Sequence, residues 1–205
     1  MTRSARPLRG AAPRRTQSAI PDPHRTMPRI PYQPADLKEP AELVAAIRAR
    51  RGGRLLNLDR MLLHSPPFAA GWNAHLRAVR TELALDAKLR ELAICVVAVL
   101  NGAEYEFRHH APEFLEAGGN AAQVEALRDP DAACGDLALF DPTDRAVLAL
   151  TIEMTRSVSV SDAAFEAVRR ALGDRRTVEL VGTIATYNMV SRFLVALGVE
   201  PEDRT

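Results

Sequence analysis

The sequence has few aromatic residues and almost no net charge, and the absence of net charge narrows the kinds of partner that we expect. Of its 205 residues, 5% are aromatic and 47% hydrophobic, and the formal net charge is +1 at pH 7. Such a balance gives no general attraction to nucleic acid or to anionic surfaces. We therefore expect no nucleic-acid partner and look for a small-molecule substrate.

Cysteine is scarce as well. The chain has two, Cys95 and Cys134, which form neither a CxxC pair nor a metal-ligand spacing. Cys95 lies within Ala-Ile-Cys-Val-Val, where a small buried side chain is expected. Because burial suppresses thiolate formation, we predict two inert free thiols in a reducing cytoplasm.

Long apolar runs are also missing. The longest uncharged one, Leu92–Leu100, falls far short of the roughly 20 residues that cross a bilayer, so we expect no membrane partner. Alanine, leucine, arginine and glutamate dominate, and such residues favour helices. No segment alternates with period two for long enough to predict a strand. The fold class we expect is all-α.

The first 27 residues differ from the rest of the chain. Arginines and prolines crowd residues 1–27, which hold a single acidic residue, Asp22. Such a segment buries too little apolar surface to offset the entropy of ordering it. We predict a disordered arm, with an organelle transit peptide as the alternative, followed by one domain over residues 28–205.

Caps, glycines and prolines divide that domain into helices. We expect the segment 129–141 to be a loop. Two long apolar helices begin alike, at Glu91 and Glu179, and each reaches an asparagine, Asn101 or Asn188, which is a faint sign of an internal repeat. We expect a first helix between Pro40 and Gly52 and a second, capped by Asn57, that ends at His64. The other predicted helices cover 66–79, 87–100, 104–116, 121–128, 142–154, 162–172 and about 175–197.

The candidate chemistry lies where the central helix ends and the next one begins. Glu91 sits within an apolar helix, and Glu106 and His110 are at i and i+4, so they share one face. A carboxylate among apolar neighbours and a histidine can exchange protons near neutral pH. The alternative is a surface ion pair. Two such ligands make no metal site, and His64 and His75 have no evident partner, so we read both as structural.

These residues stand in a longer motif: Arg90-Glu91-Leu92-Ala93-Ile94, Leu100-Asn101-Gly102-Ala103-Glu104-Tyr105-Glu106 and His109-His110-Ala111-Pro112. The motif resembles the carboxymuconolactone decarboxylase and AhpD-like alkylhydroperoxidase family. The resemblance implies an AhpD-like helical bundle and a homo-oligomer, a trimer or hexamer. It extends over about residues 27–200.

One departure from the family's motif bears directly on activity. In its redox-active branch a CxxC pair stands between the glutamate and the histidine, and here those positions are Ala103 and Glu106. A thiol peroxidase needs a nucleophilic and a resolving thiol, so we doubt hydroperoxide reduction.

The cysteine-free branch resembles the lactone decarboxylases, which implies cofactor-independent loss of carbon dioxide, with no metal, from a small lactone or carboxylated substrate. The resemblance assigns His110 as proton donor or anion stabiliser, Glu106 as its partner or the acid itself, and Glu91 as the orienting carboxylate. Tyr105 could donate a hydrogen bond to the substrate, and Arg192 could clamp a carboxylate or make a plain salt bridge. Two alternatives stay open: a family member with little redox activity, and a non-catalytic helical oligomer.

Overall fold

The computed structural model describes residues 28–202, which form helices and, within that range, no strand. The all-α prediction is confirmed, whereas the predicted arm, residues 1–27, lies outside the described residues. The helices are α1 Ala41–Arg50, α2 Asn57–Leu62, α3 Pro66–Thr81, α4 Ala87–Leu100, α5 Glu104–Glu116, α6 Ala121–Ala126, α7 Pro130–Gly135, α8 Pro142–Arg156 and α9 Asp162–Leu197.

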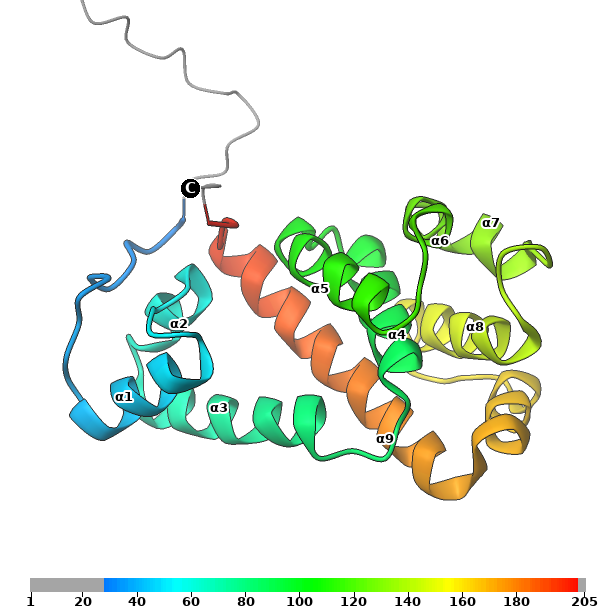
Figure 1. Ribbon diagram of the computed structural model, residues 1–205, viewed down its shortest axis with the longest axis horizontal. Helices are drawn as coiled ribbons and strands as arrows, with labels where there is room; N and C mark the ends of the chain where they lie inside the picture. The colour runs from blue at the N-terminus through cyan, green and yellow to red at the C-terminus, as the bar shows by residue number, and fades with distance from the viewer. Residues whose placement is uncertain (1–27, 203–205) are drawn as a thin grey trace, which may run out of the picture.

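Helix α4 is the centre of the fold, packed against α5, α8 and α9 (Figure 1). Asp86 caps its start by accepting hydrogen bonds from the backbone N–H groups of Lys88 and Leu89. It ends before Gly102, whose φ of 64° is the left-handed conformation that glycine adopts without strain. Because α4 is apolar on nearly all sides, it is buried along most of its length.

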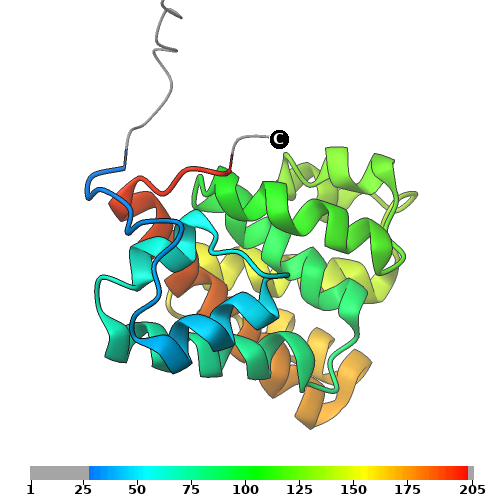
Figure 2. The same cartoon turned by 60° about the vertical axis from the view of Figure 1, so that its left-hand side comes forward.

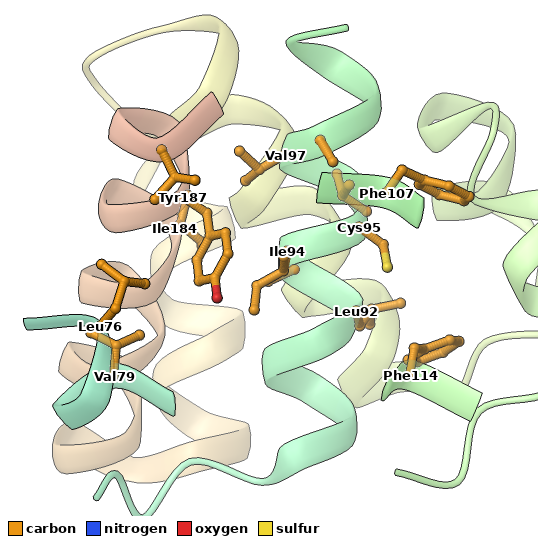
Figure 3. Packing of buried hydrophobic residues seen from close by; sticks show 14 of the residues in the cluster. Leu76, Val79, Leu92, Ile94, Cys95, Val97, Phe107, Phe114, Ile184 and Tyr187 are labelled. Carbon is orange, nitrogen blue, oxygen red and sulfur yellow. The ribbon is translucent and has the colours of Figure 1, made fainter. Parts of the chain in front are cut away.

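The core forms where α3, α4, α5 and α9 face one another (Figure 3). Leu76 and Val79 of α3 approach Tyr187 of α9, which lies beside Ile94 of α4. On the opposite side of α4, the Cys95 thiol points toward α5, where Phe107 and Phe114 are packed. The central helix therefore separates two apolar layers and fixes the positions of α5 and α9 relative to each other.

Helix α9 joins two helices that the sequence predicts separately. Gly173, with φ 75° and ψ 166°, breaks the helical backbone between them. By length and composition α9 is the one helix among residues 28–202 that could cross a membrane, but half of its most apolar stretch is buried inside the protein. The sequence analysis considered only unbroken apolar runs, and α9 was missed because polar residues such as Asn188 interrupt its apolar sequence. Its contacts with α4 and α8 are those of a core helix.

The first three helices form a layer beside α9 (Figures 1 and 2). Helix α3 contacts α1, α2 and α9, and the aromatic rings of Phe68 and Trp72 on α3 pack against Phe193 on α9. Residues 28–37 pass outside this layer, where Arg29 N–H bonds to the Leu197 carbonyl. The end of the described chain thus returns to its beginning.

Two local predictions were wrong. The segment 129–141 is not wholly a loop, because Asp129 caps the short helix α7 and accepts a hydrogen bond from Ala132 N–H, with Pro130 in its first turn. Asn57 does not cap α2 but is its first residue, since the chain enters the helix at Leu56. There the Asp59 carboxylate accepts the Leu56 N–H at 3.0 Å.

Candidate functional site

Two buried glutamates hold one buried histidine between them. His110 Nδ1 lies 2.5 Å from Glu91 Oε2, and His110 Nε2 lies 3.1 Å from Glu106 Oε2. Glu91 comes from α4, while Glu106 and His110 come from successive turns of α5. The three residues that the sequence predicts as catalytic are therefore brought together in one hydrogen-bonded chain, Glu91–His110–Glu106.

This chain lies in the protein interior. The exposed fractions of Glu91, Glu106 and His110 are 1%, 4% and 4%. An ionised carboxylate can only accept hydrogen bonds, so when both glutamates are ionised both imidazole nitrogens must carry protons. The arrangement thus stores one mobile proton between two acceptors.

The surroundings stabilise the ionised carboxylate of Glu91 and the protonated imidazole of His110. Burial opposes protonation of His110, but hydrogen bonds to Glu106 and Glu91 outweigh it and raise the pKa of the imidazole. Burial likewise disfavours an ionised Glu91, yet the hydrogen bond and charge of His110, with the Arg80 and Arg90 guanidiniums, lower the pKa of its carboxyl. Arg90 Nε donates to Glu91 Oε1 at 3.1 Å. Glu91 and His110 therefore form an ion pair at neutral pH.

A cavity of about 80 Å³ opens beside His110 and Glu106. Glu91 is not part of its wall, so it holds His110 from behind. The volume is below the roughly 300–1,000 Å³ usual for small-molecule sites. The wall comes from α1, α2, α3, α5 and α9 and is formed by Arg50, Arg51, Leu58, Trp72, Leu76, Arg80, Tyr105, Glu106, His109, His110, Glu113, Tyr187 and Val190.

Three arginines in this wall were missed by the sequence analysis. Arg50 and Arg51 stand at the end of α1, and Arg80 stands on α3. Arg80 Nη2 donates to Glu113 Oε1 at 2.9 Å. No local motif marks these residues, because each reaches the cavity only through the packing of α1 and α3 against the rest of the fold.

Tyr105 and His109 line the cavity, and both bond to the carboxylate of Glu202. The Tyr105 hydroxyl donates to Glu202 Oε1 at 3.2 Å, and His109 Nε2 lies 3.2 Å from Glu202 Oε2. The two rings stack with their centroids 4.3 Å apart. Glu202 also accepts the Asn57 N–H at the start of α2. Tyr105 is thus already a hydrogen-bond donor, to a carboxylate of the protein itself.

The same contacts shift three ionisations. Burial raises the pKa of Tyr105, with the Glu202 charge adding to it, so the phenol stays protonated. Burial opposes the charge of His109, but the hydrogen bonds to Glu202 and to the Tyr105 carbonyl raise its pKa. Burial also opposes ionisation of Glu202, yet His109 and the Asn57 N–H lower its pKa to about 2.

Arg192 is not in the cavity wall. It is exposed on α9, where its Nη1 donates to the Asn188 carbonyl and, at 2.6 Å, to Asn188 Oδ1. Asn188 Oδ1 also accepts from Asn101 Nδ2 at 3.1 Å, so the two asparagines of the suggested repeat meet between α4 and α9. The structure does not bring Arg192 together with His110.

Two further histidines of the described residues, His64 and His75, lie outside the cavity wall. His64 Nε2 lies 2.8 Å from the Pro31 carbonyl oxygen, and His75 Nε2 lies 2.8 Å from Thr186 Oγ1. Both tie neighbouring segments together, in keeping with the structural role that we expected. Within residues 28–202, no group of three or more histidine, cysteine, aspartate or glutamate side chains is arranged to hold a metal ion.

Neither cysteine is placed for thiol chemistry. Cys95 has no exposed surface, and burial raises the pKa of its thiol, with the charges of Glu91 and Glu106 adding to the effect. Cys134 is partly buried, and both thiols are free. Glu106, which stands at one of the two CxxC positions of the family's redox-active branch, places a carboxylate in the cavity wall instead of a thiol.

Comparison with known proteins confirms the predicted resemblance. Residues 66–153 match the model of the carboxymuconolactone decarboxylase family. The matched region contains Glu91, Glu106 and His110, and leaves out Arg50 and Arg51 of the cavity wall. No protein of curated function matches the sequence significantly.

Solved structures share the fold at low identity. An uncharacterised peroxidase-related protein from Silicibacter sp. TM1040 is 19% identical, with a TM-score of 0.71 over 91% of this chain and 96% of that one. A peroxidase-related protein with an alkylhydroperoxidase AhpD core, from Ralstonia eutropha JMP134, is 17% identical (TM-score 0.71, 87% and 94% covered). The debrominase Bmp8 is 16% identical (TM-score 0.70, 83% and 91% covered). The AhpD-like helical fold is therefore confirmed.

Proposed function

With residues 66–153 carrying the pattern of the carboxymuconolactone decarboxylase family, we propose that this protein is a cofactor-independent acid–base enzyme that decarboxylates a small carboxylated or lactone-type molecule. The observation that carries the proposal is the buried Glu91–His110–Glu106 chain, which meets the cavity at Glu106 and His110. A proton held there can reach a ligand without crossing bulk water.

The proposed reaction divides the roles among the three residues. The bond between the substrate carboxylate and its carbon breaks, carbon dioxide leaves, and the electron pair moves into a conjugated carbonyl of the substrate. Glu106, which faces the cavity, passes the His110 proton to the resulting carbanion, and solvent later returns a proton to His110. Glu91 lies behind His110 and keeps the imidazole oriented and charged.

The small cavity limits which substrates enter directly. Arg50 and Arg80 keep 25% and 24% of their side chains exposed, whereas Tyr187 on the inner wall is fully packed. A bicyclic or larger lactone would require these arginines to move outward. We therefore favour a substrate of few atoms within the same chemical class.

The alternative of a thiol peroxidase finds its support in the peroxidase-related relatives. The sequence argues against it, because Ala103 and Glu106 stand where the family's redox-active branch has its two cysteines. Peroxide turnover that disappeared in Cys95→Ser would restore this alternative.

The homo-oligomer implied by the resemblance remains a proposal. Its support is a set of exposed apolar side chains, including Phe68 on α3 and Val178, Met189 and Val195 on α9. A cytoplasmic location also stays a prediction.

The test compares wild type with Glu106→Gln and His110→Ala, measuring carbon dioxide release from γ-carboxymuconolactone and from smaller unsaturated carboxylates. Glu104→Gln is the matched control, because Glu104 is on the same helix turn but exposed and paired with Arg108 and Arg128. We expect both site variants to lose roughly 10² or more in rate while the control keeps it. Wild-type release that both site variants retain would contradict the assignment, and a wild type silent on every substrate would favour the non-catalytic oligomer.

A further inference from the structure

The cavity beside His110 has a cationic section of wall that the proton-transfer chain does not use. Arg50 and Arg51 share a single carboxylate, Asp59, at 3.5 Å and 3.3 Å. Asp59 is itself occupied, since it accepts the Leu56 N–H that starts α2. Two guanidiniums thus have one ionised partner, which leaves this part of the wall with an excess of positive charge.

One donor in this section lacks an acceptor. Arg51 Nε is buried and makes no hydrogen bond within the described part of the chain, because its contact with Asp59 is too poorly aligned to be one. An unsatisfied buried donor is unfavourable, because it has lost its hydrogen bonds to water without gaining an acceptor in the protein. Burial lowers the pKa of Arg50, and the neighbouring Arg51 charge lowers it further. Both observations indicate a wall that an arriving anion would stabilise.

The acidic side chains are gathered in another part of the same wall. Glu106 and the hidden Glu91 share one imidazole, His110, and Glu91 also pairs with Arg90, so that the charges balance there and the Glu106 carboxylate faces the cavity. Arg80 is matched one to one with Glu113. A ligand carrying one negative group would therefore be oriented, with that group toward Arg50 and Arg51 and away from Glu106.

We propose that Arg50 and Arg51, assisted by Arg80, form a subsite for the carboxylate of a small organic acid. A planar guanidinium fork matches a carboxylate, and about 80 Å³ accommodates only a few heavy atoms. The subsite replaces Arg192 as the clamp. It rests on the proposed function only in that the bound acid is its substrate, and Arg50 and Arg51 lie outside the region matched to the family.

The protein contains its own reporter for a direct test. Trp72 is the single tryptophan of the chain and lines the cavity, so its fluorescence follows occupancy. Sodium acetate is titrated into the full-length protein at constant ionic strength, and acetamide serves as the neutral probe of the same shape. We expect a saturable change with acetate and none with acetamide.

Variants identify the residues responsible. Arg51→Gln and Arg80→Gln should each weaken acetate binding by roughly tenfold or more, whereas Arg77→Gln should not, because Arg77 is exposed on α3 and pairs with Glu82. Thermal unfolding followed by circular dichroism shows which variants are folded. If Arg51→Gln unfolds because Asp59 loses an ion-pair partner, Arg80→Gln still tests the subsite, because Arg80 pairs with Glu113 and its substitution leaves the bond between Leu56 N–H and Asp59 intact.

Each outcome separates this inference from the proposed function. Acetate and acetamide binding equally, or both arginine variants binding acetate like wild type, would overturn the subsite. Glu106→Gln should lose turnover and keep acetate binding. Binding without turnover therefore supports the subsite while contradicting the enzyme, and turnover that is independent of Arg51 and Arg80 does the reverse.

Discussion

Replacing Glu91 by glutamine should separate the charge of this residue from its shape. Glutamine keeps an oxygen that can accept from His110 Nδ1, now 2.5 Å from the carboxylate, and it leaves the contact between His110 and Glu106 in place. Removing one partner of a buried ion pair costs about 3–5 kcal/mol. Because one hydrogen bond and one carboxylate survive, we expect Glu91→Gln to lower the free energy of unfolding by about 2–3 kcal/mol.

The loss should depend on pH in a way that identifies both groups. The pKa of His110 is raised above its ordinary 6.5, so its stabilisation is complete below pH 6.5 and disappears as the pH rises through the folded-state pKa. The pKa of Glu91 is lowered below 4.5, so its stabilisation is complete above pH 4.5 and disappears as the pH falls through the folded-state value. The difference between wild type and variant should therefore be largest between pH 4.5 and 6.5.

Urea unfolding across pH 4–9 measures this difference, and the NMR shift of the His110 Hε1 proton follows the imidazole directly. In Glu91→Gln the burial of His110 is opposed by one carboxylate instead of two, so its pKa should fall. Glu104→Gln is the control, and its exposed ion pairs should contribute less than about 1 kcal/mol. Equal stability of Glu91→Gln and wild type at pH 5.5, with an unchanged His110 titration, would refute the ion-pair account.

Two further substitutions test the backbone and the thiols. Gly173→Ala places a side chain at φ 75°, ψ 166°, a conformation nearly confined to glycine, and should destabilise the protein by about 1–3 kcal/mol. Gly182→Ala lies in the same helix with open space around it and should stabilise the protein by up to about 1 kcal/mol. Thermal melts that rank the two variants in the opposite order would contradict this reasoning. In native protein, Cys95 should react with a disulfide reagent at least roughly 100-fold more slowly than Cys134, because its thiol is buried and resists ionisation; rapid release of two equivalents would show that the core opens readily.

What the sequence predicts well is what neighbouring residues determine. Asp86 and Gly102 mark the limits of α4 because a cap and a left-handed residue act on the adjacent backbone. Glu106 and His110 share a face through helical spacing alone. The short helix α7 was missed because Asp129 and Pro130 are equally common in turns.

Contacts between residues far apart in the sequence could not be predicted, because neighbouring residues do not determine them. Local spacing cannot show that Arg51 approaches the cavity, nor that Glu202 bonds to Tyr105, since these contacts exist only after α1 packs against α3 and Glu202 reaches α5. Arg192 was chosen as a clamp from its place on α9, but its side chain turns back to Asn188. The grouping of Glu91, Glu106 and His110 could thus be predicted, while the arginines of the cavity wall could not.

The hydrogen bond from Asn57 to Glu202 spans 145 residues of sequence, and it has a consequence for the order in which the protein matures. A chain emerging from the ribosome at roughly 5–20 residues per second can form the helices that carry Glu91 and His110 long before Tyr187 and Glu202 appear. During that interval the ionisable pair has no closed compartment and remains open to water. The compartment around the ion pair should therefore close only after Glu202 has been synthesised.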